Sequence, residues 1–168
     1  MTEKAPMTVE GEKALRAEHD HLTKNVRNQI SKEIAAAREL GDLKENAEYH
    51  AAKEQQGLTE ARIREIESKL TNSQVIDVTA IPSSGKVIFG VTLDLYDLGK
   101  DQEVVFKIVG EDEANVNEGK ISFSSPLARA LIGKAEGDVA KFESPSGPQE
   151  YEIAVSYTHL TLPTKRIV

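Results

Sequence analysis

Apolar residues in the first half of the chain recur at the spacing of a helix and leave most other positions polar. The first run is separated by seven, four and three positions, which favours one apolar helix face over a strand; its members are Leu15, Leu22, Val26, Ile30, Ile34 and Ala37. A second run follows through Ala51, Gln55, Leu58, Ile63, Ile66 and Leu70. Gly41 lies between the runs and favours a left-handed stop. The pattern predicts two narrow helices that fold back as an antiparallel coiled-coil hairpin.

From about Gln74 the apolar residues alternate instead, as they do in strands. One predicted strand contains Val87, Phe89, Val91, Leu93 and Leu95, and the next, after a turn at Asp97 to Asp101, contains Val104, Phe106 and Ile108. A short strand follows at Ile121 and Phe123, and two more are predicted at Val139 to Phe142 and Tyr151 to Val155, joined across Pro145 to Pro148. This half therefore reads as a small antiparallel sheet.

Ser125 and Pro126 predict the start of a short helix, with serine as N-cap and proline at the first helical position, and Gly133 predicts its end. We therefore expect an α+β chain: a helical hairpin in residues 1–78 and a small globular sheet domain with one short helix in residues 79–157. Residues 158–168, THLTLPTKRIV, show no cap or turn signal, and we expect a foreign or disordered tail.

Composition narrows the class of protein. At 168 residues, 39% hydrophobic and 29% charged, the chain suits one ordinary domain or two small ones. The absence of cysteine excludes disulfides and thiol chemistry. The sequence shows neither a signal peptide nor an apolar run of membrane length, so we expect a cytoplasmic protein with no membrane partner.

The net charge of -7 argues against long-range attraction to nucleic acid, but a local basic stripe runs along the first predicted helix. Five cations fall within an arc of roughly 80° on a helical wheel and are interrupted by Asp20; they are Lys13, Arg16, Lys24, Arg27 and Arg38. Spacing alone favours solvated charges that flank a helix contact. The alternative is a track for a phosphate chain.

Asp42 and Glu45 lie at the bend between the two predicted helices and have two interpretations. Spacing favours a capping box, in which Asp42 is the N-cap and Glu45 reaches back from the third helical position. In the second interpretation, which is compatible with the first, both carboxylates face a hard cation such as Mg²⁺, which prefers oxygen ligands. Two ligands hold Mg²⁺ poorly, so a partner would supply the others. We interpret the nearby Glu48 and His50 as solvated, and no autonomous active site is visible in the sequence.

From Pro6 to Tyr157 the sequence resembles the Gre family of bacterial transcript cleavage factors. Its most specific pieces are GDLKENAEYHAAKEQQG at Gly41 to Gly57 and SFSSPLARALIGK at Ser122 to Lys134. Supporting pieces are VIFG from Val87 and IVGEDEA from Ile108. Pro148 is unusual for the family, and the tail after Tyr157 does not match the family's ending. The resemblance implies a coiled-coil hairpin followed by a globular domain similar to FK506-binding proteins.

The resemblance also implies a function. Such a factor inserts its hairpin into the secondary channel of a backtracked RNA polymerase, and the cleavage chemistry remains the polymerase's own. By this carry-over, Asp42 and Glu45 help to hold a weakly bound Mg²⁺ of the polymerase near the RNA 3′ end, and the isolated protein holds no metal. RNA-contact candidates are Arg38, Lys44, Lys53 and Arg27; Leu43, Asn46 and Tyr49 would shape the tip.

The implied partners are bacterial RNA polymerase, the nascent RNA 3′ end and the DNA of the elongation complex, and we expect a monomer. The docking candidates come from the segment at Ser122 to Lys134: Ser122, Ser125, Pro126, Leu127 and Arg129. Helix-start and core spacing explains Pro126 and Leu127 without a partner. Three other functions stay open: a channel-occluding inhibitor, a structural coiled-coil adaptor, and a free-standing nuclease or DNA-binding protein.

Overall fold

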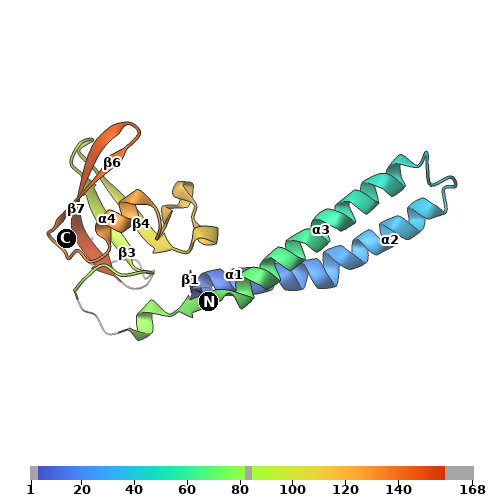
Figure 1. Cartoon of the computed structure of the whole chain (residues 1–168), viewed down its shortest axis with the longest axis horizontal. Coiled ribbons are helices and arrows are strands. Elements are labelled where there is room, and N and C mark those ends of the chain that lie inside the picture. The colour runs from blue at the N-terminus through green and yellow to red at the C-terminus, as the bar shows by residue number, and fades with distance from the viewer. Residues whose placement is uncertain (1–3, 82–84, 158–168) are drawn as a thin grey trace, which may run out of the picture. The chain divides into compact units, whose positions relative to one another are not determined.

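The computed structural model describes residues 4–81 and 85–157 and divides them into two compact units (Figure 1). The first unit consists chiefly of Glu10–Ser73, and the second combines Ala5–Val9 with the chain from Gln74 onward. Residues Ala5–Val9 therefore group with the later part of the chain, and the hairpin lies between these two pieces in the sequence. The predicted tail at 158–168 lies outside the described residues, as does part of the segment around the predicted domain boundary.

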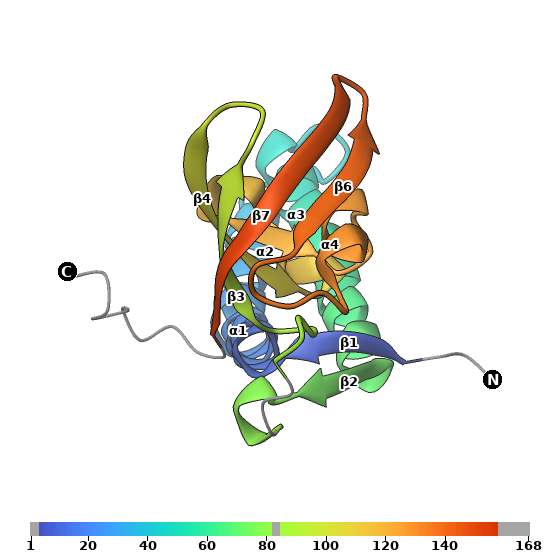
Figure 2. The ribbon, with the colours of Figure 1, turned by 90° about the vertical axis from the view of Figure 1, so that its left-hand side faces the viewer.

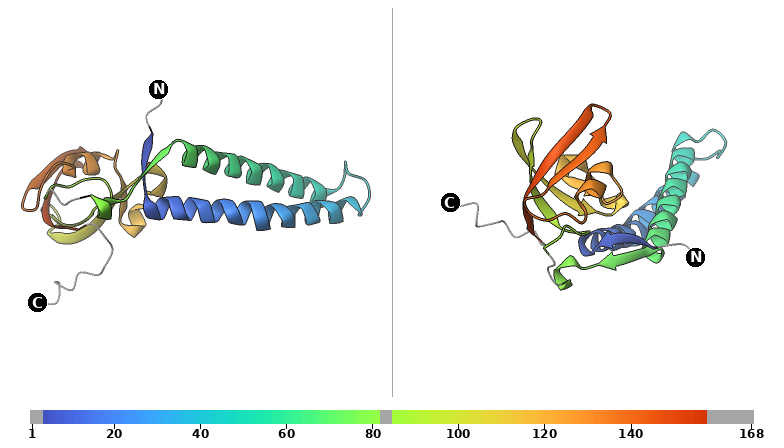
Figure 3. Two further views of the ribbon diagram at one scale, coloured as in Figure 1. Left: turned by 90° about the horizontal axis from the view of Figure 1, so that it is seen from below. Right: turned by 60° about the vertical axis from the view of Figure 1, so that its left-hand side comes forward.

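The first unit is a helical hairpin, as the periodicity predicts. Its first arm is continuous through three helical segments: α1 (Val9–His21), a π-helix (Leu22–Val26) and α2 (Arg27–Arg38). Its second arm is a single helix, α3 (Ala47–Thr71). The two arms run side by side and are joined at one end by a loop (Figure 3, left).

The π-helix explains an irregular step in the first apolar seam. Coiled-coil seams alternate steps of three and four residues, whereas this seam takes three successive steps of four, through Leu22, Val26, Ile30 and Ile34. A π turn adds one residue to an α-helix and so absorbs the extra position. The seam therefore stays on one face, where Ile30, Ile34 and Ala37 are buried.

The predicted seam of the second arm is wrong by one residue over its first half. The buried residues of α3 are Ala52, Thr59, Ile63 and Ile66. Leu58, in contrast, is 60% exposed. Steps of four and three, taken backward from Ile63, reach residues 59, 56 and 52. The prediction followed the large apolar side chain of Leu58, whereas the period places the small side chains of Thr59 and Ala52 on the seam.

Charged side chains tie the two arms together beside the apolar seam. Arg27 donates two hydrogen bonds to Glu60, both at 2.8 Å, and Arg62 donates two to Glu18, at 2.7 and 2.8 Å. These bidentate contacts lower the pKa of both carboxyls, chiefly through the hydrogen bonds from the arginines. All four side chains are about one-third to two-fifths exposed, so the pairs fix register more than they add stability.

The second unit contains a five-stranded sheet in the order β5-β4-β3-β7-β6 (Figure 2). The strands are β3 (Thr92–Asp97), β4 (Gln102–Val109), β5 (Lys120–Ser122), β6 (Val139–Ser144) and β7 (Gly147–Tyr157). All neighbours pair antiparallel except β4 and β5, which are parallel. The predicted sheet is thus confirmed, with one parallel pair added. Two 3₁₀ turns, Glu111–Glu113 and Val116–Glu118, lie between β4 and β5.

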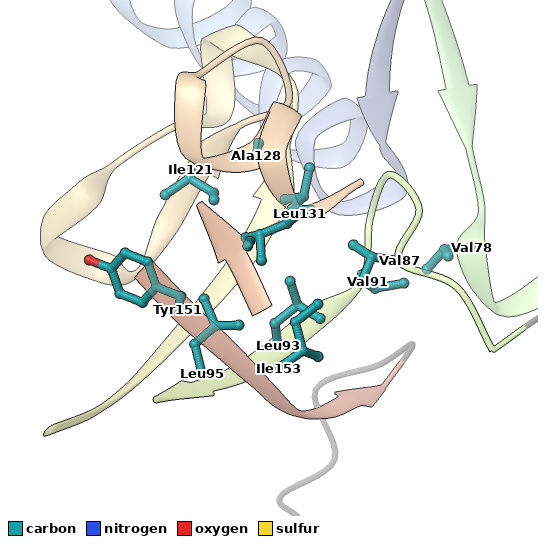
Figure 4. Close-up of a cluster of buried hydrophobic side chains, with 12 residues drawn as sticks. Val78, Val87, Val91, Leu93, Leu95, Ile121, Ala128, Leu131, Tyr151 and Ile153 are labelled. Carbon is teal, nitrogen blue, oxygen red and sulfur yellow. The ribbon is translucent and has the colours of Figure 1, made fainter. Parts of the chain in front are cut away.

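One short helix, α4 (Pro126–Leu131), covers a face of this sheet, and its predicted start is confirmed. Ser125 Oγ accepts a hydrogen bond from the Ala128 amide at 3.3 Å, which caps the helix. Leu131 and Ala128 point from the helix into the core, where they meet Leu93 and Ile153 from the sheet (Figure 4). All four side chains are fully buried.

The predicted strand from Val87 to Leu95 is wrong in its first half. Strand β3 begins only at Thr92, and Gly90 lies in a turn with φ of 90°. A Cβ at Gly90 would lie 3.1 Å from Cβ of Val78, in a 3₁₀ turn (Val78–Ala80), so glycine suits both the angle and the contact. Val87 and Val91 are buried although they are outside a strand. Apolar residues that alternate along this segment are therefore buried without belonging to a paired strand.

A two-stranded sheet that the sequence did not indicate pairs β1 (Ala5–Thr8) with β2 (Ser73–Ile76) (Figure 2). Met7 and Thr8 are each 3% exposed. The carboxylate of Glu113 accepts hydrogen bonds from the backbone amides of Thr8 and Gly110, both at 3.0 Å. These contacts bind β1 to the second unit. Within the described ranges, no helix is long and apolar enough to cross a membrane.

Candidate functional site

The loop that joins the two arms of the hairpin, residues 39–46, is called the tip loop below. Helix α2 ends at Arg38 and Gly41 has a φ of 117°, so the predicted glycine stop is confirmed. The next four residues are all exposed: Asp42, Leu43, Lys44 and Glu45. The hairpin therefore presents two carboxylates at its closed end.

The predicted capping box at Asp42 and Glu45 is wrong. The N-cap of α3 is Asn46, whose Oδ1 accepts a hydrogen bond from the Tyr49 amide at 3.0 Å. Asparagine and aspartate are equally good N-caps, and the segment GDLKEN contains both. The spacing argument therefore selected Asp42 where the structure uses Asn46. Helix α3 starts only after both acids, and neither of them caps it.

The side chains of Asp42 and Glu45 make few contacts within the protein. Asp42 Oδ1 accepts one hydrogen bond from the Lys44 amide at 2.9 Å, which closes a tight turn. Glu45 has no hydrogen bond or ion pair with any residue in the described ranges. Both carboxylates thus keep most of their oxygen lone pairs available to a ligand.

Two carboxylates suit a hard divalent cation, but they do not complete a site for one. Mg²⁺ requires six oxygen ligands in near-octahedral geometry, of which protein carboxylates often supply only one or two. Among the described residues, no group of three or more histidines and acids is placed to hold a metal ion. The two carboxylates alone would therefore fill only part of the coordination shell of such a cation.

Side chains at the N-cap and in the first turn of α3 hold the tip loop. Asn46 Nδ2 donates to the carbonyl of Ala37, the last buried residue of α2, at 2.5 Å. His50 Nε2 lies 3.2 Å from the carbonyl of Lys44. The ring of Tyr49 packs beside the cluster of Ile30, Ile34 and Ala52.

The four RNA-contact candidates have different surroundings. Arg38 is exposed, with its guanidinium carbon 5.8 Å from the Tyr49 ring centre. Lys44 is exposed at the tip, and Lys53 donates to Gln56 on its own helix at 3.0 Å. Arg27 is committed to Glu60, and this hydrogen bond raises the pKa of its guanidinium. The charges of Arg38, Lys44 and Lys53 are thus still available to a ligand, whereas that of Arg27 is paired with Glu60.

The rest of the predicted basic stripe is partly neutralised within the first arm. Arg16 pairs with Glu12 at 3.1 Å and Lys24 with Asp20 at 3.6 Å. Both are exposed i,i+4 pairs, which contribute a few tenths of a kcal/mol at most. Together with the pairing of Arg27, they favour charges that flank the helix contact, as the spacing does.

The docking candidates surround the start of α4 in the second unit. Ser125 is used locally, because its hydroxyl donates to the Ser122 carbonyl at 2.7 Å and also caps the helix. Leu127 packs against the core, half-buried. Pro126 and Arg129 are exposed. Of the five candidates, these last two present the most surface to a partner.

Comparison with known proteins places both units. Residues 5–75 match the family described as "Transcription elongation factor, N-terminal". Residues 82–156 match the family described as "Transcription elongation factor, GreA/GreB, C-term". The two matches together span most of the described chain.

Individual relatives cover nearly the full length. Transcription elongation factor GreA of Pseudomonas aeruginosa is 63% identical over 150 residues, which are 89% of this chain and 95% of that protein. The protein of the same name from Thioalkalivibrio sulfidiphilus is 57% identical over 155 residues, 92% and 98% of the two chains. Among solved structures, GreA factor homolog 1 of Thermus thermophilus is 26% identical with a TM-score of 0.41, and the match covers 92% and 99%.

Proposed function

This chain belongs to the GreA/GreB family of transcription elongation factors, and from that premise we propose that its tip loop carries Asp42 and Glu45 into the reaction centre of bacterial RNA polymerase. There the two acids stimulate cleavage of backtracked RNA by the polymerase. The observation that carries the proposal is that neither acid caps a helix and that both are exposed at the closed end of the hairpin.

The proposed role of the two carboxylates is to complete a set of oxygen ligands. Bound Mg²⁺ supplies positive charge that stabilises the transition state of phosphodiester cleavage. Glu45 has no partner to give up among the described residues, and Asp42 has one hydrogen bond from a neighbouring amide. Redirecting these carboxylates toward a cation therefore breaks little of the protein's own structure.

The cations near the tip support the same role. Arg38, Lys44 and Lys53 are exposed and lie in the same segment, residues 38–53, as the two acids. The segment also carries four acids, so it is not a basic patch, but each cation can contact a phosphate group of the RNA directly. We assign them the task of holding the RNA 3′ segment while the acids face the reacting phosphate.

The polymerase supplies the chemistry and the docking surface in this proposal. Among the described residues, no third histidine or acid joins the two carboxylates in a group that could hold a metal ion. In this proposal the protein is a monomeric accessory factor of the cytoplasm, and its partners are RNA polymerase, the nascent RNA and the DNA of the elongation complex. Pro126 and Arg129 are the first docking residues to test.

A reconstituted backtracked elongation complex with 5′-labelled RNA tests the proposal. Wild-type protein should accelerate shortening of the RNA from its 3′ end in the presence of Mg²⁺. Asp42→Asn and Glu45→Gln should each reduce that acceleration by about 10-fold or more, because each removes a charged ligand. Glu48→Gln is the matched control, since Glu48 is an exposed carboxylate three residues further on and should be dispensable.

Other outcomes assign other functions. Inhibition without RNA shortening would identify a channel-occluding inhibitor. Full activity in the double variant Asp42→Asn, Glu45→Gln would leave the hairpin as a structural adaptor. Cleavage of naked RNA by the protein and Mg²⁺ alone would identify a nuclease. Each of these results overturns the proposal.

A further inference from the structure

We infer that Asn46 and His50 are positioning residues that hold Glu45 in place for the proposed function, on which this inference rests. Both residues lie at the start of the second arm. The Asn46 side chain bonds to Ala37 at the end of the first arm, and the His50 side chain bonds to Lys44 within the tip loop. Together they fix the backbone on both sides of Glu45, the tip acid whose side chain has no partner among the described residues.

Asn46 closes the tip loop across the hairpin. Its Nδ2 reaches back nine positions to the carbonyl of Ala37, while its Oδ1 accepts the Tyr49 amide. One side chain therefore links the end of α2 to the start of α3. Since Ala37 and Tyr49 both belong to the packed part of the hairpin, the backbone directly after Glu45 is tied to a rigid support.

His50 secures the backbone directly before Glu45. The Lys44 carbonyl can only accept, so the His50 ring nitrogen at 3.2 Å donates to it. The His50 ring also meets the Tyr49 ring edge-on, with 5.7 Å between ring centres, which limits the directions it can take. The expectation that His50 is merely solvated thus misses a contact six residues back along the chain.

The consequence concerns how accurately the carboxylate of Glu45 is delivered. An acid on an untied exposed loop samples many positions, and a shift of about 1 Å can cost a catalytic arrangement up to 100-fold. Glu45 has no hydrogen bond of its own to hold it, so its position depends on the residues at each side. The two bridges supply that order before the factor meets its partner.

Three substitutions separate positioning from helix capping. Asn46→Ser keeps a capping oxygen for the Tyr49 amide but removes the amide group that reaches Ala37. His50→Ala removes the donor to Lys44, and His50→Gln restores an N–H donor as the conservative rescue. Matched controls elsewhere on the hairpin are Asn28→Ser, which removes a local Asn-to-carbonyl bond to Lys24, and His21→Ala, at an exposed histidine.

The first readout is the Mg²⁺ dependence of RNA cleavage in the backtracked complex. Asn46→Ser and His50→Ala should raise the Mg²⁺ concentration for half-maximal stimulation about 10-fold or more, the usual effect of removing a ligand's support. The protein concentration needed for half-maximal effect should stay unchanged, because docking is untouched. His50→Gln and both controls should behave as wild type.

The second readout needs no polymerase. ¹⁵N relaxation of the free protein should give Lys44 and Glu45 order parameters near the rigid value of about 0.85, falling toward 0.6 in Asn46→Ser and His50→Ala. Unchanged order parameters, or an unchanged Mg²⁺ requirement in a factor that stimulates cleavage, would overturn the inference. If wild-type protein fails to stimulate cleavage, the proposed function fails, and the order parameters alone decide whether the two residues hold the loop.

Discussion

Thr8 and Glu113 lie 105 positions apart in the sequence and are joined by two hydrogen bonds, one from the Thr8 amide at 3.0 Å and one from its hydroxyl. The oxygen that receives the Thr8 amide also receives the amide of Gly110. One carboxylate therefore satisfies three donors, and two of them belong to a strand from the opposite end of the described chain.

Removing this carboxylate should destabilise the second unit. Glu113→Ala leaves donors of the buried residues Thr8 and Gly110 without their acceptor, which should cost about 1 to 3 kcal/mol of unfolding free energy. Urea unfolding measured by circular dichroism gives the value. Glu103→Ala is the control, because Glu103 is exposed on β4 and has no partner among the described residues. Equal effects of the two substitutions would contradict the role of Glu113.

The tip acids should be nearly silent in stability measurements. Asp42→Asn and Glu45→Gln should each change the free energy of unfolding by less than about 0.5 kcal/mol, since neither residue caps a helix. Asn46→Ala, in contrast, should cost about 1 kcal/mol because it removes the N-cap of α3. Thermal melts of the three variants measure this. A loss at Glu45 as large as that at Asn46 would restore the capping-box interpretation.

The hairpin should lose stability in acid through its cross-arm pairs. The hydrogen bonds from Arg62 and Arg27 lower the pKa of Glu18 and Glu60 in the folded protein. Carboxyls with a lowered folded pKa contribute stability that is complete above the unfolded value of about 4.3 and lost as pH falls through the folded value. The helical melting temperature should therefore fall below about pH 4.5.

The double variant Glu18→Gln, Glu60→Gln provides the comparison for this pH dependence. It should melt lower than wild type at pH 7, and the difference should shrink as pH falls and the wild-type carboxyls protonate. Melting curves recorded at half-unit intervals from pH 7 to about pH 3 show this directly. A constant difference at every pH would mean that the pairs do not titrate with folding.

The π-helix should tolerate the loss of one residue. Deleting Asn25, which is exposed and whose side chain bonds only to His21 in the described ranges, shortens the first of the three successive steps of four to a step of three, so that the seam from Leu22 to Ala37 spans two heptads. Helicity and thermal stability should remain close to wild type. Deleting Gly57 from α3 has no such remedy, because it turns the rest of that arm by about 100° and moves Ala52 off the seam. Far-ultraviolet circular dichroism measures the helicity and the melting temperature of both deletion variants. An equal loss in the two variants would contradict this explanation of the π-helix.

Periodicity predicted the elements whose side chains bury one face over many residues. The hairpin and the β3–β4 pair follow from it, whereas the start of α4 follows from the cap signal of Ser125 and Pro126. It failed where burial and period disagree. Leu58 is large and apolar yet exposed, and β1 is too short to show a period at all. Its Thr8 amide bonds to the carboxylate of Glu113, a contact that no local pattern reveals.

The candidate site was also only partly predictable from the sequence. The sequence placed Asp42 and Glu45 on a solvated bend, and the structure confirms the bend. Which residue caps α3 could not be decided by spacing, because Asp42 and Asn46 are both good caps and the choice depends on where the helix starts. The contact from His50 to Lys44 forms only in the folded loop, so no sequence pattern indicates it.

Because Ala5–Val9 group with the later part of the chain, the hairpin is an insertion within the second unit rather than a domain placed before it. Engineering can exploit this order. Adding or removing seven residues on each arm changes the length of the stalk by about 10 Å and leaves every seam contact in phase. The reach of the tip loop is thereby adjustable, while the second unit stays unchanged.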